Sequence, residues 1–367
     1  MNENILALRV GENRRRALTK TVGKATGGRP MELQKISHYQ IIRPLGAGGM
    51  GAVFLAEDTR LDRRVAIKFL PIDMAKDEKS KGRLISEARA AAKVEHPNIC
   101  SIHEAIEEEP ACIVMEYIEG ETLSDRIHGH PLKIRTSLDL VIQLADALEE
   151  LHSCGMIHRD IKPGNVIVTP RGRVKLLDFG LATMVRPIHG DMEKMVTQNP
   201  VTKAGSIVGT VAYMSPEQAT GHSVDSRSDL FSLGTLLYEC LTGKRPFSGT
   251  TAMEEGANVI YSNPMPPSHF NRAVPAELDR ITLKLLAKKA EERYQSAGKL
   301  IQELRMVRDN LTGEGFNCVK GNSSESTGAN PISSIVRQKR LGQPMISYKA
   351  IFTRACNRVG LALSLFI

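Results

Sequence analysis

Several features are scarce or missing in this chain of 367 residues, and each absence narrows the class of protein. There is no tryptophan, and aromatic residues make up only 4% of the sequence. The six cysteines are scattered, no two of them form a CxxC pair, and no histidine lies at a spacing typical of zinc sites. The cysteines therefore favour buried thiols in a reduced, cytoplasmic protein over a disulfide framework or a zinc module.

Long apolar runs are also missing. No stretch reaches the roughly 18 apolar residues that a membrane-spanning helix needs. The N-terminus does not have the order of a signal peptide, because its ILAL stretch is short and the basic RRR run follows it. The chain ends on VGLALSLFI, which is too short to span a bilayer. We expect a cytoplasmic protein, with membrane attachment only if a longer chain continues past residue 367.

The middle of the chain lacks a surplus of basic residues. The net charge is +8, but residues 1–38 hold eight Lys and Arg against three Asp and Glu. Residues 312–367 hold seven against two, so the two ends carry +10 and residues 39–311 carry −2. This distribution argues against a nucleic-acid partner for the middle of the chain. The ends read as solvated flexible arms, with weak contact to anionic lipid or acidic partners as the alternative.

The residue patterns predict an α+β protein with two lobes. β-type runs alternate with turns from Tyr39, and an Ala-rich helix interrupts them before two further strands. After Gly120 the residue pattern is typical of helices. One helix is expected to start at a capping box from Thr136 to Asp139 and to stop at Gly155. Later helices are predicted over 227–243, which is nearly all apolar and therefore buried, and over 275–288 and 296–313.

These patterns give four predicted regions. An irregular basic arm covers 1–38, a β-rich small lobe covers 39–118, a mainly helical large lobe covers 119–311, and a basic flexible tail covers 312–367.

A glycine loop lies between the first two predicted strands. Gly46, Gly48 and Gly51 have the spacing G-x-G-x-x-G-x-V, which alone is a weak signal. A dinucleotide-binding fold needs a helix after such a loop, whereas a β-type run follows here. The order strand, loop, strand suits a hairpin whose backbone N–H groups close over phosphates.

Lys68 and Glu87 are candidates for an ion pair beneath this lid. Lys68 ends the apolar strand VAIK, and Glu87 lies 19 residues further on, within the Ala-rich helix. Paired with Glu87, the ammonium would be held against phosphate oxygens. The alternatives are a solvent-exposed edge lysine and, for the acid, Glu78, Glu95 or an ordinary surface salt bridge.

The stretch HRDIKPGN at 158–165 is followed by DFG at 178–180 and by SPE at 215–217. Together with the glycine loop, VAIK and Glu87, these motifs resemble those of the eukaryotic-type protein kinases over about residues 39–311. The segments GTVAYMSPEQAT and DLFSLGTLLYECLTGKRPF are most similar to those of bacterial serine/threonine kinases. The resemblance implies a two-lobed protein-kinase fold and ATP-dependent phosphorylation of protein Ser and Thr hydroxyls.

The resemblance also assigns catalytic roles. Asp160 would accept the proton of the substrate hydroxyl, and Lys162 would reach the γ-phosphate. Asn165 and Asp178 would hold Mg²⁺, with Mn²⁺ as an alternative metal. Lys162 and Thr210 mark a preference for Ser and Thr, while His158 is expected to be structural. Lys68 and Glu87 complete the predicted catalytic set.

The predicted ATP site is larger. Met115 would lie behind the adenine, and Glu116 and Ile118 would offer backbone groups to its edge. The remaining predicted contacts are the lid residues Leu45, Gly46, Ala47, Gly48, Gly49, Met50 and Gly51, together with Lys68, with Val53 and Ala66 above the ring and Ile167 below it.

Two structural supports are predicted. Glu217 is expected to pair with Arg293 inside the large lobe, and Asp229 is expected to anchor the backbone of the loop around Asp160. The sequence departs from the family pattern in having Ser215 in SPE and Ala290 where a proline is usual.

Activation is predicted to depend on a phosphate in the segment between Asp178 and Glu217. Thr202 is the first candidate acceptor, and Ser206 and Thr197 are the others.

The partners would be protein substrates, with a homodimer that phosphorylates itself in trans as one option, and membrane association is left open. A scaffold that binds ATP and partners without catalysis is the alternative function, and an ATP hydrolase is a third.

Overall fold

The computed structural model describes residues 35–48, 51–70, 77–108, 110–177 and 211–313, which all belong to one compact unit ending at Asn317. Several predictions fall outside these residues. They concern most of the N-terminal arm, the tail after Gly313 and a set of candidate site residues, namely Gly49, Met50, Asp178, Thr210, Thr197, Thr202 and Ser206.

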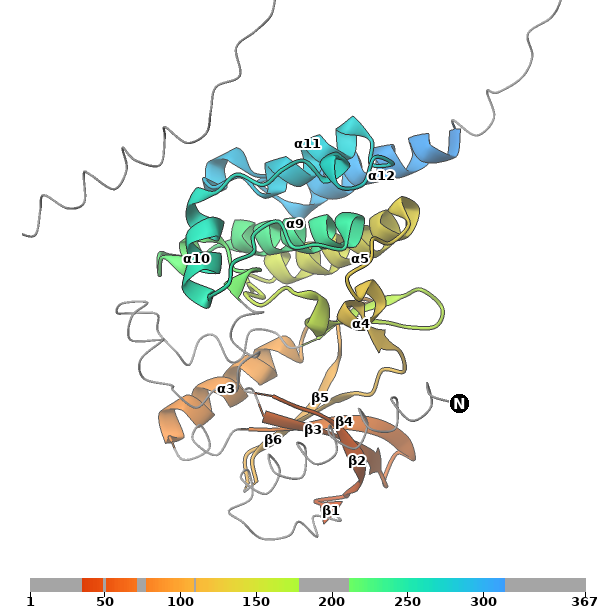
Figure 1. The fold of residues 1–367 in the computed structure, drawn as a ribbon. Coiled ribbons are helices and arrows are strands. Elements are labelled where there is room, and N and C mark those ends of the chain that lie inside the picture. Colours follow the sequence, from red (N-terminus) through yellow and green to blue (C-terminus); the bar gives the residue numbers. More distant parts are fainter. Residues whose placement is uncertain (1–34, 49–50, 71–76, 109, 178–210, 314–367) are drawn as a thin grey trace, which may run out of the picture. The chain divides into compact units, whose positions relative to one another are not determined.

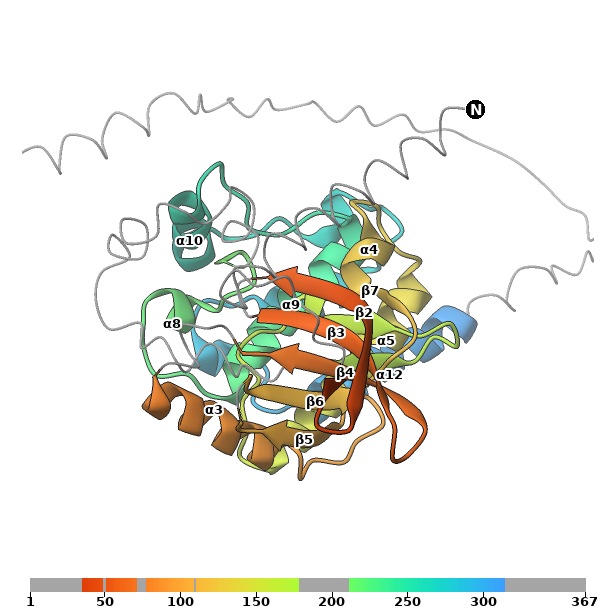
Figure 2. The same ribbon diagram turned by 90° about the horizontal axis from the view of Figure 1, so that it is seen from below.

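The small lobe is an antiparallel six-stranded sheet with one helix. Its strands follow the order β1-β2-β3-β4-β6-β5. Figure 2 shows β2, β3, β4, β6 and β5 side by side in that order. Helix α3 (Glu78–Ala91) begins at Asp77, whose side chain accepts a hydrogen bond from the Ser80 amide, and it buries Leu84, Ile85, Ala88 and Ala91. The strands are β1 (Lys35–Ile36), β2 (Tyr39–Gly48), β3 (Gly51–Asp58), β4 (Arg63–Phe69), β5 (Ile102–Ile106) and β6 (Cys112–Glu116).

Strand β1 corrects the predicted boundary of the arm. Lys35 and Ile36 pair with Gln40 and Tyr39 of β2, so these two residues belong to the sheet and not to an irregular segment. The reason is apolar burial, because Ile36 and Tyr39 are both buried in the small-lobe core.

Strands β2 and β3 form the predicted hairpin around the glycine loop. Their register runs to the pair Gly48 and Gly51, and Gly46 lies opposite Val53. Gly51 has a φ of 110°, a backbone conformation that residues with a Cβ rarely adopt. The order strand, loop, strand is therefore confirmed, and the third glycine of the motif has a conformational reason.

The large lobe is built around α9 (Ser226–Thr242), which lies beside α5 (Ile134–Ser153) and α11 (Ala276–Leu285) (Figure 1). Fourteen of the residues of α9 are buried, which confirms the prediction of a buried helix. The other elements are α4 (Leu123–Ile127), α8 (Pro216–Ala219), α10 (Ala252–Tyr261), α12 (Ala297–Gly313), the 3₁₀ turns η1 (Pro163–Asn165), η2 (Pro267–His269) and η3 (Ala290–Glu292), and a sheet of β7 (Glu121–Thr122), β8 (Val166–Val168) and β9 (Val174–Leu176) in the order β7-β8-β9.

The start of α5 differs from the prediction. The helix begins at Ile134 with Lys133 as its N-cap, and no side chain caps it, so the capping box from Thr136 to Asp139 is wrong. Ile134 packs against the large-lobe core, and this contact favours a helix that starts three residues earlier. Across the described residues, no helix combines the length and the apolar character needed to cross a membrane.

Candidate active site

The loop at 158–165 is anchored by Asp229, at the start of α9. The Asp229 carboxylate is fully buried and accepts hydrogen bonds from the backbone amides of His158 (2.8 Å) and Arg159 (2.7 Å). It also lies 2.8 Å from Nε2 of His152 on α5. Because α9 is buried in the lobe, these bonds fix the loop to the core of the large lobe. The predicted anchoring role of Asp229 is confirmed.

Three predicted catalytic side chains converge within the loop. The Lys162 ammonium donates to both carboxylate oxygens of Asp160, at 3.0 and 2.8 Å. The Asn165 amide donates to Oδ2 and to the backbone carbonyl of Asp160, both at 2.8 Å. The 3₁₀ turn η1, which starts at Pro163, brings Asn165 back toward Asp160. A carboxylate, an ammonium and a side-chain amide are thus held at one point by partners only a few residues apart.

His158 and Arg159 shape the backbone next to Asp160. The His158 ring is buried, and its Nε2 lies 2.9 Å from the carbonyl oxygen of Leu177, which agrees with the predicted structural role. Arg159 has a φ of 66°, in the left-handed region. Its carbonyl accepts a hydrogen bond from Gln218 of α8 at 2.8 Å. The strained residue is therefore held from two sides, by Gln218 and by Asp229.

The Arg159 side chain has an unusual environment. Its Nε is buried and has no hydrogen-bond partner among the residues that the structure describes. Burial lowers the pKa of this guanidinium, although the nearby carboxylates of Glu87 and Asp229 oppose the shift. Such a cation has donor capacity that an added anion could use.

The predicted adenine contacts belong to one apolar cluster. Ala66 lies opposite Met115 in the register of β4 and β6, and both are buried. Val53 of the small lobe and Ile167 of β8 pack against the same cluster, so it joins the two lobes. The cluster also includes Ile118, which is 9% exposed. The structure therefore brings together the four side chains that were predicted to surround the adenine, along with Ile118, whose backbone was predicted to meet the adenine edge.

The structure describes Lys68 and the first residues of the glycine loop, Leu45 to Gly48. Leu45 is 37% exposed, and Gly46 has open space where a Cβ would point. Ala47 and Gly48 continue β2 as backbone. Lys68 is 8% exposed and lies opposite Val53 in the register of β3 and β4. Strand β4 thus places the lysine directly beside the strand that follows the glycine loop.

Glu87 has a different partner from the predicted one. Its Oε1 lies 3.4 Å from Nε of Arg83, one turn earlier on α3, and the contacts of the described residues include no ion pair between Glu87 and Lys68. Burial raises the pKa of Glu87, with Arg83 and Arg159 opposing the shift. The physical reason for the difference is local competition, because residues four apart on a helix are always neighbours.

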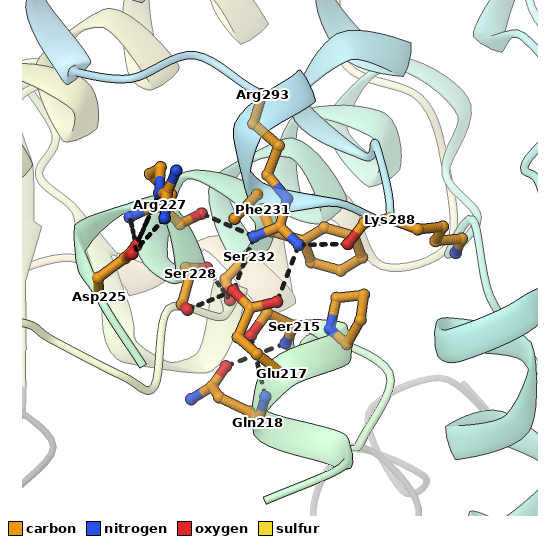
Figure 3. A network of polar contacts seen from close by, with 12 residues as sticks. Ser215, Glu217, Gln218, Asp225, Arg227, Ser228, Phe231, Ser232, Lys288 and Arg293 are labelled. Carbon is orange, nitrogen blue, oxygen red and sulfur yellow. Dashed lines mark hydrogen bonds and ion pairs between the residues drawn. The ribbon is translucent and has the colours of Figure 1, made fainter. Parts of the chain in front are cut away.

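Glu217 and Arg293 form the predicted buried ion pair (Figure 3). The Arg293 side chain is fully buried and donates to both oxygens of Glu217, at 2.7 and 2.8 Å. Burial alone would raise the pKa of Glu217, but hydrogen bonds from Arg293 and Ser228 outweigh it and lower the pKa. Ala290 starts η3, and the Arg293 amide donates to its carbonyl, so the turn forms without the usual proline.

A cavity of about 310 Å³ lies beside this ion pair, and Pro216, Lys288 and Ala290 are among its lining residues. Among the residues that the structure describes, none of the predicted catalytic or ATP-binding residues lines it.

Sequence reasoning missed two residues that support the site. Gln218 bonds the Arg159 carbonyl, and it also completes a capping box with Ser215 at the start of α8. Lys175 of β9 pairs with Glu116 of β6 at 2.7 Å. A capping box could have been read from Ser215 and Gln218, but neither long-range partner is encoded in a local pattern.

The residues around Asp160 fit a magnesium ion that is shared with a nucleotide. The Asn165 nitrogen is used toward Asp160, which leaves the Asn165 oxygen as the donor atom of that side chain. In the part of the chain that the structure describes, no three His, Cys, Asp or Glu side chains gather into a self-contained metal site. Mg²⁺ is usually held by one or two protein oxygens together with phosphates, so the donor set suits it.

Comparisons with known proteins agree with this geometry. Residues 39–304 match the protein kinase domain family, and the chain belongs to that family. It is 39% identical over 277 residues to serine/threonine-protein kinase PknB of Mycobacterium tuberculosis, an alignment that covers 74% of this chain and 43% of PknB. It is 37% identical over 290 residues to PrkC of Bacillus subtilis, covering 78% of this chain and 42% of PrkC.

A solved structure gives the same result for the fold. The PknI kinase domain of Mycobacterium tuberculosis superposes with a TM-score of 0.58 at 26% identity, over 75% of this chain and 96% of that domain. The predicted α+β, two-lobed protein-kinase fold is confirmed. The chain spans less than half the length of the curated relatives it matches.

Proposed function

We propose that this chain is an ATP-dependent serine/threonine protein kinase. The observation that carries the proposal is the convergence of Asp160, Lys162 and Asn165, with distances of 2.8 to 3.0 Å between their polar atoms. Phosphoryl transfer needs positioning and charge neutralisation more than covalent chemistry, and this cluster supplies both. Membership of the protein kinase family and the names of the bacterial relatives support the same activity.

Three residues of the loop have a part in the proposed reaction. The Asp160 carboxylate accepts the proton of a substrate Ser or Thr hydroxyl. At the same time the hydroxyl oxygen bonds to the γ-phosphorus, and the bond between the γ-phosphorus and the ADP oxygen breaks. The Lys162 ammonium, already within 3.0 Å of Asp160, balances charge on the transferred group. The Asn165 oxygen, and Asp178 by resemblance, would hold Mg²⁺, which neutralises phosphate charge when bound.

The adenine side of the site is proposed from the apolar cluster. Val53 and Ala66 would pack on one face of the ring and Ile167 on the other, with Met115 behind it. The backbones of Glu116 and Ile118 would meet its polar edge. The glycine loop would close over the phosphates, since its hairpin geometry brings backbone N–H groups together.

Activation by phosphorylation is part of the proposal. Arg159 directly precedes Asp160, and no described residue offers its buried Nε a hydrogen bond. A phosphate on the segment before α8 would offer this cation charge-assisted bonds. Thr202 is the first choice of acceptor, and Thr210 would contact Asp160 and Lys162. A homodimer that phosphorylates itself in trans and Ser- or Thr-containing protein substrates are further parts of the proposal.

The rival function is a scaffold that binds ATP without catalysis. Such a protein would have lost the lysine, the catalytic aspartate or a metal ligand, whereas Lys68, Asp160, Asn165 and Asp178 are all present.

The test of the proposed function is incubation with ATP and Mg²⁺, followed by mass-spectrometric mapping of phosphate on the protein and on a Ser/Thr peptide library. We expect phosphate on Ser or Thr, with Thr202 dominant in the protein and a loss of activity in Thr202→Ala. Release of free phosphate without labelled Ser or Thr would instead indicate an ATP hydrolase. Binding of ATP with no turnover would indicate the scaffold.

A further inference from the structure

A partly buried ion pair joins β6, which the proposed nucleotide site uses, to β9, whose end is bonded to Asn165. Lys175 lies on β9 and Glu116 ends β6, and their Nζ and Oε2 atoms are 2.7 Å apart. The side chains are 17% and 30% exposed. The contact links residues 59 positions apart, so it is a tertiary connection and not a local pair. It is shielded enough from water to count as a charge-assisted hydrogen bond.

Both charged groups also bond to the segment 98–101 that runs between the two strands. Lys175 Nζ donates to the carbonyl of Ile99 at 3.2 Å. Glu116 Oε2 accepts from the amide of Ser101 at 3.3 Å, and the Glu116 amide donates to the carbonyl of Ser101 at 2.9 Å. The ion pair therefore sits on a common backbone support, which fixes its geometry.

The same segment is bonded to the backbone of β9. The Cys100 amide donates to the carbonyl of Leu176 at 2.9 Å, and the Leu176 amide donates to the carbonyl of Asn98 at 2.8 Å. At the end of β9, the Leu177 amide donates to the carbonyl of Asn165 at 2.8 Å. A continuous set of hydrogen bonds thus leads from Glu116, through β9, to the residue proposed to hold the metal.

We propose that Lys175 is a positioning residue. It holds β6, which contacts the adenine through Glu116, in a fixed position relative to the loop at 158–165, which holds the metal and accepts the proton. The inference rests on the proposed function, because it uses the roles given there to the Glu116 backbone and to Asn165. Lys175 touches neither substrate nor metal in this proposal. It acts through Glu116 on one side and through β9 and Asn165 on the other.

The competing interpretation is an ordinary stabilising contact. A pair of this kind on a free surface contributes about 0–1 kcal/mol to folding and leaves catalytic constants unchanged. Three features argue for more: the shared backbone support, the partial burial and the position between two functional strands. A control pair with similar distance but no link to the site is available in Arg280 and Glu303, which join α11 to α12 at 2.6 Å.

The experiment compares Lys175→Met, Lys175→Arg and the control Arg280→Met in the full chain, after wild-type activity has been established. Lys175→Met should raise the KM for ATP about tenfold, the order expected when one charge-assisted hydrogen bond is lost, and leave the KM for peptide unchanged. Lys175→Arg should restore most of the affinity. Arg280→Met should lower thermal stability without changing either KM.

Direct measurements of nucleotide binding make the test more specific. Titrations with adenosine, ADP and ADP plus Mg²⁺ separate the adenine contacts from the metal contacts. We expect Lys175→Met to reduce the gain in ADP affinity that Mg²⁺ provides, because the two halves of the site are no longer held in register. Adenosine affinity should change by less than threefold.

The outcomes distinguish the two proposals. If wild-type protein binds nucleotide but phosphorylates nothing, the proposed function fails. The positioning role is overturned if the wild-type protein is active and the Lys175→Met variant folds but changes neither the KM for ATP nor the gain in ADP affinity from Mg²⁺ by more than twofold. A gain of activity in the variant would also overturn it. Should Lys175→Met not fold, Glu116→Gln breaks the same pair and is subject to the same expectations.

Discussion

The loop at 158–165 and helix α3 both carry residues that the proposed reaction needs, but the two regions hold them in different ways. The loop is bonded to distant elements, through Asp229 of α9 and Gln218 of α8. Glu87 of α3 is bonded within its own helix, to Arg83. The loop at 158–165 is therefore held by distant parts of the fold, whereas Glu87, the acid expected to orient Lys68, is held by a contact that costs little to exchange.

The energies of the two regions differ accordingly. Each backbone hydrogen bond from the loop to the buried carboxylate of Asp229 contributes about 1.5–3 kcal/mol, as is typical of hydrogen bonds to charged groups. An ion pair between residues four apart on a helix surface contributes about 0.3–0.5 kcal/mol. A change of state in this protein is thus expected to move α3 and Glu87, and to leave the loop around Asp160 as it stands.

The largest effect is expected from Asp160→Asn. The amide keeps the size of the side chain and can still accept from Lys162, but it cannot take the hydroxyl proton. Loss of a general base typically lowers kcat by about 10²–10⁴-fold. Steady-state kinetics on a peptide, with ATP binding measured in parallel, should show lost turnover and nearly intact binding. Retention of the wild-type kcat would remove Asp160 from the mechanism.

Arg293→Met should have the next largest effect, on stability. It leaves the carboxylate of Glu217 in a largely buried position without its main partner, so unfolding should become easier by about 3–5 kcal/mol. Chemical denaturation measures the change. Arg280→Met, which breaks a more exposed ion pair, is the matched control and should cost far less. Equal losses in the two variants would show that the Glu217 pair is not a main support of the lobe.

The same network predicts a loss of stability in acid. Because the folded pKa of Glu217 is lowered, its contribution is fully present above the unfolded pKa of about 4.3 and is lost as the pH falls through the folded value. Denaturation curves of wild type and Glu217→Gln should therefore converge below about pH 4. If the difference between them stays constant from pH 7 to pH 3, the carboxylate is not the group responsible.

The smallest effect is expected from Arg83→Gln. Removing the guanidinium releases Glu87 from its present partner, and the basal activity should rise by roughly twofold, as expected for a contact of this strength. Lys81→Gln breaks a pair with Glu78 on the same helix and should leave basal activity unchanged. A fall in activity for Arg83→Gln would mean that Arg83 supports the active arrangement.

The sequence predicted the fold class and most of the site because kinase motifs are short and local. HRDIKPGN places Asp160, Lys162 and Asn165 within six residues, and one loop with a 3₁₀ turn is enough to bring them together. The long-range pair of Glu217 and Arg293 was also predicted, but from the family resemblance and not from the residues alone.

What could not be predicted depends on competition between similar groups. Glu87 has Arg83, Lys68 and Arg159 as candidate partners, and only the orientation of α3 decides among them. Lys175 and Gln218 are ordinary polar residues in sequence, and their partners lie 59 positions away in each case. The start of α5 was misplaced because tertiary packing of Ile134 outweighed the local capping signal.

The most direct test of the contrast between the loop and α3 is a double-mutant cycle with Lys68→Met and Glu87→Ala. It is measured as kcat/KM on phosphorylated protein and again after phosphatase treatment. We predict a coupling free energy of about 1–3 kcal/mol in the phosphorylated enzyme, so that the double variant is little worse than either single one, and near zero in the dephosphorylated enzyme. Additive effects in the phosphorylated enzyme would show that Glu87 is not the partner of Lys68, and equal coupling in both forms would show that α3 does not change its contacts.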